Sequence, residues 1–117
     1  MKKAALIACA LAGFASTLAL GDAPKGDPAR GQGLYMKNMC YTCHGTSGQG
    51  GDRGSGPRIA PNPFPWEAFT TAVRRPRESM PRYPAEFVSD QELADMHAYL
   101  TAFKTGTKAA DVPLLKE

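Results

Sequence analysis

The sequence predicts an all-α fold of three to four short helices joined by long loops. Two helix starts are well marked, one at Asp27-Pro28 and one at Ser89-Asp90-Gln91-Glu92. Between them, residues 64–73 carry large apolar side chains at helical spacing. Six of the 12 glycines lie in residues 45–57, which we therefore expect to form a loop. At 117 residues, the chain has room for one domain.

The first 21 residues have the layout of a secretory signal peptide. Lys2 and Lys3 precede an apolar run, residues 4–20, that contains no charge. Ala19-Leu20-Gly21 places small residues at the −3 and −1 positions, so we expect cleavage after Gly21. The sequence thus divides into a signal peptide, residues 1–21, and a single domain, residues 22–117.

Two other interpretations of this segment stay open. The apolar run is close to the lower length limit of a bilayer-spanning helix, about 17–25 residues, so an uncleaved membrane anchor is one of them. Leu6-Ile7-Ala8-Cys9 has the form of a lipoprotein box, but it lies so near the N-terminus that most of the apolar run would remain on the protein. The layout of a signal peptide is the better match, so we expect export to the periplasm without a membrane anchor.

Removal of the leader leaves a domain that is nearly neutral. Of the 14 Lys and Arg residues 12 remain, against all 11 Asp and Glu residues. Nucleic-acid binding requires a strong basic footprint, which this domain lacks. The domain also keeps only Cys40 and Cys43 of the three cysteines.

These two cysteines belong to the pattern Cys40-Tyr41-Thr42-Cys43-His44, the C-x-x-C-H motif of c-type haem attachment. Two thiols three residues apart can reach the two vinyl groups on one edge of a porphyrin, and the next residue then lies under the iron. A redox-active C-x-x-C pair would follow a strand in a βαβ pattern, and none is visible here. A zinc site would need four ligands, and the only other histidine is His97. The motif therefore predicts one covalent haem c on Cys40 and Cys43, with His44 as an axial ligand.

Residues 30–103 resemble the class I cytochrome c family. A helix precedes the haem motif, a Gly-Pro loop follows it, and a Met-Pro pair and a closing helix come downstream. The resemblance implies that the helices and loops surround the haem, which transfers single electrons. It also implies that the Pro57 carbonyl accepts a hydrogen bond from the proximal imidazole, and that Ile59 is an apolar haem contact.

The first helix is expected over residues 28–39, with Asp27 as N-cap and Pro28 at the first helical position. It should present Leu34, Tyr35 and Met39 to the core. In the family a glycine and an aromatic residue of this helix pack against the last helix, and Gly31 and Tyr35 are the candidates here. Tyr35 lies five residues before the first haem cysteine, where four is commoner in the family, and a one-residue bulge before Cys40 would absorb the difference.

The glycine-rich residues 45–57 are expected to pass close to the haem edge. They contain no G-K-[ST] and no G-x-G-x-x-G between strand and helix, which argues against a phosphate-binding loop.

The next helix is expected over residues 64–73 and carries Trp66, Phe69 and Val73 on one face. Core packing accounts for Phe69 and Val73. Trp66 is a candidate to donate its indole N–H to a haem propionate, because a buried indole usually finds a partner.

Met80 is the expected distal ligand, since it lies in a proline-pinned loop, Ser79-Met80-Pro81-Arg82-Tyr83-Pro84, as the family's distal methionine does. Met36 and Met39 on the first helix and Met96 in the last are weaker candidates. His97 would give a bis-histidine site, but we expect it near the surface of the last helix. An open distal site, which would serve ligand binding or catalysis, is the remaining alternative.

The last helix begins with the capping box Ser89-Asp90-Gln91-Glu92. Leu93, Met96, Leu100 and Phe103 follow at helical intervals, and Gly106 is placed to end the helix.

With His44 and Met80 both bound, the iron has no open position for a substrate, so we expect an electron carrier and not an enzyme. Its partners would be redox proteins: a flavoprotein or quinoprotein dehydrogenase, or a terminal oxidase. Two roles stay open, a diffusible shuttle and the electron-accepting subunit of a dehydrogenase. Four arginines near Met80 could form a docking rim for an acidic partner: Arg74, Arg75, Arg77 and Arg82.

Overall fold

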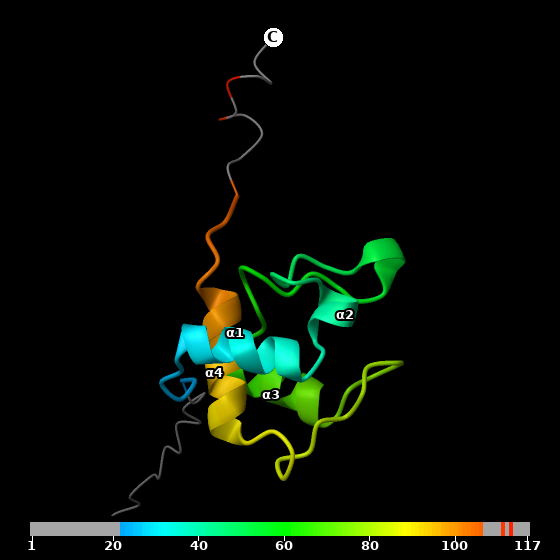
Figure 1. The fold of residues 1–117 in the computed structure, drawn as a ribbon, viewed down its shortest axis with the longest axis vertical. Helices are drawn as coiled ribbons and strands as arrows, with labels where there is room; N and C mark the ends of the chain where they lie inside the picture. Colours follow the sequence, from blue (N-terminus) through cyan, green and yellow to red (C-terminus); the bar gives the residue numbers. More distant parts are fainter. Residues whose placement is uncertain (1–21, 107–110, 112, 114–117) are drawn as a thin grey trace, which may run out of the picture.

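The computed structural model describes residues 22–106, 111 and 113. Its elements in chain order are α1 (Pro28–Lys37), α2 (Tyr41–His44), the 3₁₀ turn η1 (Asp52–Gly54), α3 (Trp66–Arg74) and α4 (Asp90–Thr101). The described residues form helices and loops without a strand, so the all-α prediction is confirmed (Figure 1). The signal-peptide prediction falls on residues 1–21, outside the described part of the chain. None of the helices in the described part is long and apolar enough to cross a membrane.

Helix α1 begins where the sequence predicts and ends earlier. The Asp27 carboxylate accepts from the Ala29 and Arg30 amides at 2.9 and 3.3 Å. The helix closes with a Schellman motif, in which Cys40 N donates to Tyr35 O at 3.1 Å and Met39 N to Met36 O at 3.0 Å. Met39 takes the left-handed conformation at φ 60° and is 58% exposed. The expectation that Met39 faces the core is therefore wrong, because the chain reverses there.

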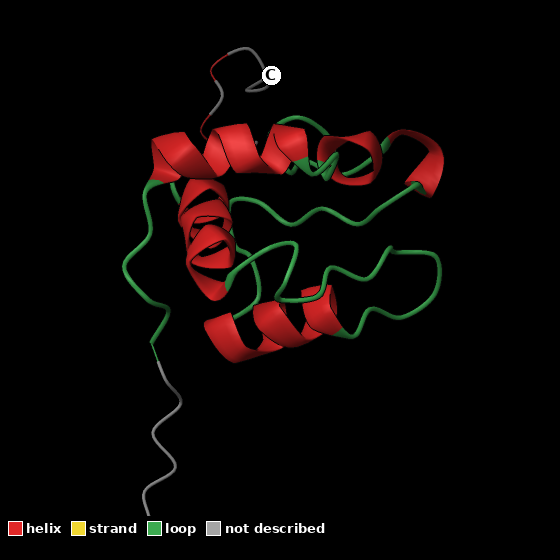
Figure 2. Cartoon of the chain, turned by 60° about the horizontal axis from the view of Figure 1, so that its bottom comes forward, coloured by secondary structure: helices red, strands yellow, loops and turns green. Residues whose placement is uncertain are grey.

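Helices α1 and α4 cross closely, as Figures 1 and 2 show. Gly31 lies at the crossing, where an added Cβ would fall 1.9 Å from Asp95 O. Only a glycine permits this approach of the two backbones. Tyr35, one turn later, is 2% exposed, and its ring centroid is 5.5 Å from that of Tyr99 in α4. Gly31 and Tyr35 thus have the packing roles expected for them.

Helix α4 forms the centre of the core. Ser89 caps it as predicted, since Ser89 Oγ accepts from Glu92 N at 3.2 Å and Glu92 Oε2 accepts from Ser89 N at 2.8 Å. The helix ends at Thr101, before the expected stop at Gly106. Ala102 N donates to both Ala98 O and Tyr99 O, so the last turn is tightened and the helix ends there. Phe103 lies beyond the end, with its ring centroid 5.0 Å from that of Tyr99.

Helix α3 packs against α4 through its aromatic face. Phe69 is buried, and its ring centroid lies 5.0 Å from that of His97 and 6.4 Å from that of Trp66. His97 Nε2 lies 2.9 Å from Phe64 O. His97 is half-buried and this contact is exposed, so His97 lies near the surface of α4 as expected, with its ring against Phe69 of α3.

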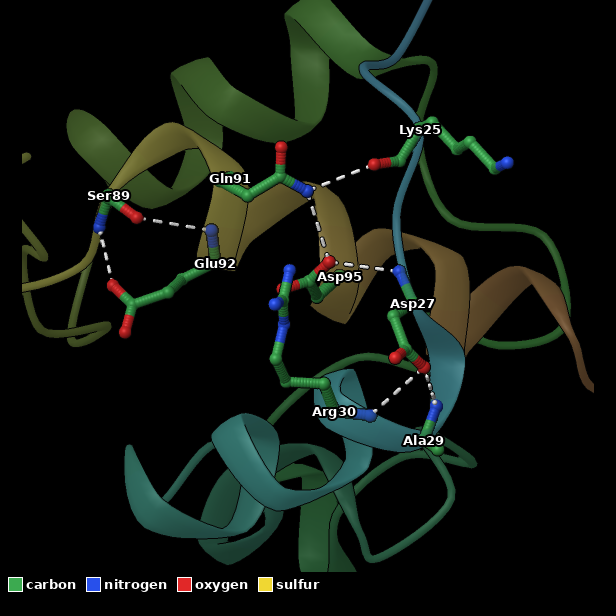
Figure 3. A network of polar contacts seen from close by, with 8 residues as sticks. All are labelled: Lys25, Asp27, Ala29, Arg30, Ser89, Gln91, Glu92 and Asp95. Carbon is green, nitrogen blue, oxygen red and sulfur yellow. Dashed lines mark hydrogen bonds and ion pairs between the residues drawn. The ribbon is translucent and has the colours of Figure 1, made fainter.

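A carboxylate lies at the end of the α1–α4 crossing, as Figure 3 shows. Asp95 is fully buried and accepts hydrogen bonds from Asp27 N at 2.9 Å, Arg30 Nε at 2.6 Å and Gln91 Nε2 at 3.2 Å. The Arg30 hydrogen bond is the largest influence that holds the pKa of Asp95 below its usual value, and burial opposes it. The network fixes the start of α1 against α4. This network was not predicted from the sequence, because an aspartate in a helix is ordinarily on the surface.

Candidate functional site

Helix α2 carries the C-x-x-C-H motif directly after the reversal at Met39. Cys40 is its N-cap residue, and both Cys40 and Cys43 are free. His44 N donates to Cys40 O at 3.0 Å, and Thr42 Oγ1 donates to Met39 O at 2.7 Å. Residues three apart in a helical turn share a face, so the two thiols lie on the same side of α2.

The Cys40 thiol differs from that of a redox-active cysteine pair. Burial raises its pKa to about 11. In redox C-x-x-C motifs the pKa of the attacking thiol is lowered, which makes it a reactive thiolate at neutral pH. Cys40 stays a neutral thiol under those conditions, which argues against disulfide exchange as its chemistry.

The His44 ring has one nitrogen fixed by the chain. His44 Nδ1 lies 2.8 Å from Pro57 O, and a carbonyl can only accept, so Nδ1 carries the hydrogen. This contact leaves Nε2 as the ring nitrogen that can bind a metal. A hydrogen bond of this kind orients a ligating imidazole and increases its basicity.

The loop after His44 is held tightly against the motif. Gly50 N donates to His44 O at 2.8 Å, and Gly51 N donates to Gly56 O at 3.0 Å. An added Cβ on Gly51 or Gly56 would fall 2.0 or 2.5 Å from Cys43 O. The glycine content of this loop therefore reflects close backbone approach to the cysteine motif.

Two tyrosine hydroxyls also reach this loop. Tyr35 Oη donates to Gly45 O and Tyr99 Oη donates to Thr46 O, both at 2.8 Å. Sequence analysis placed Tyr35 in the core and missed its polar contact. Nothing in the local sequence reveals it, because the acceptors belong to a loop whose path only the tertiary fold defines.

Ile59 and Trp66 lie at the edge of the core. Both are half-buried and pack against the core cluster, and Ile59 N donates to Gly48 O at 2.8 Å. Trp66 has its ring centroid 5.9 Å from that of His97. Its ring also stacks on Phe69, with the centroids 6.4 Å apart.

Met80 lies in the wall of a separate pocket of about 570 Å³. Helix α3, Phe64 before it and the loop that follows it form this pocket, whose lining includes none of Cys40, Cys43 and His44. Its lining residues include both apolar and charged side chains: Phe64, Glu67, Ala68, Thr71, Ala72, Arg75, Arg77 and Met80. The Met80 side chain thus borders open space and is not packed in the core.

The four arginines near Met80 divide into two kinds. Arg74 is bound to the fold, because it donates to Tyr83 O at 2.8 Å, to Val88 O at 2.6 Å and to the Asp90 carboxylate at 2.6 Å. Arg74 therefore stabilises the structure, and the expectation that it belongs to a docking rim is wrong. The other three are exposed: Arg75, Arg77 and Arg82.

The described residues contain no group of three or more His, Cys, Asp or Glu side chains that could hold a metal ion. The haem fits the site on other grounds. The two free thiols share a face of α2, and Pro57 leaves one nitrogen of the adjacent imidazole open to a metal. An all-helical chain with this arrangement has the features of a c-type cytochrome domain.

The comparisons with known proteins agree with that class. The family model described as cytochrome c oxidase, cbb3-type, subunit III matches residues 26–100. The chain belongs to this family, whose c-type cytochrome domain binds haem c and transfers electrons to and from redox partners. Searches of curated proteins and of solved structures gave no match.

Proposed function

We propose that this protein is a periplasmic one-electron carrier with a single haem c. Cys40 and Cys43 attach the haem, His44 and Met80 are its axial ligands, and residues 1–21 are the export signal. The observation that carries the proposal is the 2.8 Å contact between His44 Nδ1 and Pro57 O, next to two free thiols. This contact occupies Nδ1 of His44, the residue after the second cysteine, and leaves Nε2 to bind iron.

The residues around the motif have distinct roles in this proposal. The thiols of Cys40 and Cys43 fix the position of the haem edge, and Pro57 orients His44 and increases its basicity. Ile59 supplies apolar contact, which keeps water from the ligand side. Trp66 is the candidate to donate its indole N–H to a propionate, because a partly buried indole usually finds a partner.

Met80 is proposed as the second ligand because its side chain borders open space and its thioether is soft and neutral. When bound, the haem supplies a reversible Fe(III)/Fe(II) couple, and thioether ligation raises its potential relative to a second imidazole. Met39 is 58% exposed, but it directly precedes Cys40, at the start of the segment that carries His44. We therefore do not propose it as the second ligand. Met96 is 4% exposed in the core, so it has no free path to a ligand.

The partners we propose are redox proteins with an acidic surface near their own redox centre. Arg75, Arg77 and Arg82 are exposed in the segment that carries Met80, so they can steer such a partner toward the site. The donor or acceptor is a flavoprotein or quinoprotein dehydrogenase, or a terminal oxidase. The family description, a cytochrome c oxidase subunit, supports the oxidase. The protein acts either as a diffusible shuttle or as the electron-accepting subunit of an enzyme. Size-exclusion chromatography of the native protein separates these two roles, because a shuttle elutes alone and a subunit elutes with its enzyme.

The direct test is an optical spectrum of the exported protein, oxidised and reduced, with mass spectrometry of the intact chain. We expect a low-spin spectrum in both states, one haem per chain, and a chain that begins at Asp22. A high-spin spectrum that changes at once with CO would contradict Met80 ligation and favour an open distal site. The Cys40→Ala/Cys43→Ala double variant is the control, and its chain mass should lack the haem.

A further inference from the structure

The aromatic pair at the helix crossing reaches the loop that follows His44. Tyr35 of α1 and Tyr99 of α4 are 2% and 8% exposed, and their ring centroids are 5.5 Å apart. Their hydroxyls donate to neighbouring carbonyls, those of Gly45 and Thr46, at 2.8 Å each. Two buried phenols from the first and last helices therefore hold one short stretch of backbone.

This stretch is connected to the segment that carries Pro57. Gly48 N donates to Gly45 O at 3.1 Å, and Gly48 O accepts from Ile59 N and Ala60 N at 2.8 and 2.9 Å. Gly48 is itself packed closely against α4, because an added Cβ would fall 2.7 Å from a Leu100 methyl carbon. His44 is thus adjacent to backbone that α1 and α4 hold in place, and Pro57 lies two residues from the backbone that is bonded to it.

We propose that Tyr35 and Tyr99 are positioning residues that keep the His44 ring against the Pro57 carbonyl and thereby help to set the reduction potential. They act through the loop of residues 45–48, and neither touches the imidazole in the structure. The inference rests on the proposed function, because it requires His44 as an iron ligand.

The direction of the effect follows from the contact that the tyrosines support. Donation from His44 Nδ1 to Pro57 O makes the imidazole more basic, and a more basic ligand stabilises the ferric state over the ferrous state. A looser loop weakens this hydrogen bond, so the reduction potential should rise. Hydrogen bonding beyond the axial ligand is an established way for a protein to adjust a haem potential.

The test uses Tyr35→Phe, Tyr99→Phe and the double variant, all as haem-loaded protein. Phenylalanine keeps the ring pair and removes only the donors. We expect each single variant to have a higher midpoint potential and faster deuterium exchange of the His44 Nδ1–H, measured by NMR on the reduced protein. The double variant should show the largest change, and if it fails to load haem, the two single variants decide.

Arg30→Ala is the matched control, because it weakens the same helix crossing at the Asp95 end and leaves the loop of residues 45–48 untouched. It should unfold more easily, with the unchanged potential and unchanged Nδ1–H exchange of the parent. Unaltered values in both tyrosine variants would overturn the inference, as would an equal change in Arg30→Ala. The spectrum of the parent protein separates the two proposals, because a parent without His44-ligated haem refutes both, whereas a ligated parent with unaffected tyrosine variants refutes only this one.

Discussion

The segments around His44 and around Met80 are held by the chain in different ways. Backbone hydrogen bonds, two phenol hydroxyls and the Pro57 carbonyl fix the first segment along its length. The hydrogen bonds of the second lie at its ends, where Tyr83 N donates to Val73 O at 3.2 Å and Arg74 binds Tyr83 O and Val88 O. In Figures 1 and 2 the loop after α3 extends on the same side of the molecule as α2 and η1. We infer that the polypeptide places His44 by itself, whereas the proposed ligation by Met80 would depend on the metal to fix this segment.

The largest difference should appear when each ligand is removed. We expect His44→Ala to attach much less haem during maturation, because the imidazole that would hold the iron beside the two thiols is gone. Met80→Ala should keep covalent haem, bind CO, and show a midpoint potential lower by about 0.1 V or more, within the roughly 0.8 V that axial ligands span. Haem content by mass and a redox titration measure the two effects. Equal haem loss in both variants would contradict the comparison.

The crossing of α1 and α4 supports the His44 segment, and a single methyl group should disrupt it. Gly31→Ala places a Cβ 1.9 Å from Asp95 O, in a backbone contact that cannot yield cheaply. We expect it to lower the free energy of unfolding by about 3 kcal/mol, the upper end for overpacking. Gly33→Ala is the matched control, since no atom lies within 4 Å, and it should stabilise α1 by about 0.5–1 kcal/mol. Denaturant titration of both variants tests the contrast, and similar effects in the two would show that the crossing is not close.

Acid should weaken the same crossing through Asp95. Its pKa is lowered in the folded protein, so its contribution is present above the usual Asp pKa of about 3.9 and is lost as the pH falls through the lower folded value. We expect Asp95→Asn to cost about 1.5–3 kcal/mol at neutral pH, the usual worth of hydrogen bonds to a charged group. The loss should shrink below pH 4, which urea titrations at several pH values measure. A cost that stays constant down to pH 2 would show that the Asp95 charge contributes nothing.

The smallest effect is expected where the Met80 segment is anchored. Arg74→Met should cost about 1–2 kcal/mol, because it removes the donors to Tyr83 O and Val88 O. It should also increase the fraction of reduced protein that binds CO, since the loop is freer to release Met80. Arg75→Met is the control, an exposed neighbour that should stay within about 0.5 kcal/mol of the parent. Equal CO binding in the two variants would mean that Arg74 does not hold the loop.

Local sequence was enough to predict the starts of α1 and α4, whereas α3 begins at Trp66, two residues after its expected start at Phe64. Asp27-Pro28 and Ser89 to Glu92 satisfy the first free amides of α1 and α4 with nearby side chains, so these starts need no tertiary context. The ends were predicted less well. Helix α1 stops at Lys37 because Met39 takes a left-handed conformation, and no glycine marks that position in the sequence. Helix α4 stops at Thr101, where the last turn tightens, ahead of the glycine that would have indicated its end.

The sequence by itself predicted the proposed haem chemistry, because C-x-x-C-H requires only five consecutive residues and one helical turn. It also determined the all-α class and the glycine of the helix crossing. Only the tertiary structure decided which side chains hold the site. Tyr35 and Tyr99 donate to the loop after His44, and Asp95 binds α1 to α4. Arg74 donates to the Tyr83 carbonyl, and the His97 ring packs against Phe69 of α3. Their partners lie far away in the sequence, so each role depends on chain segments that meet only when the domain folds.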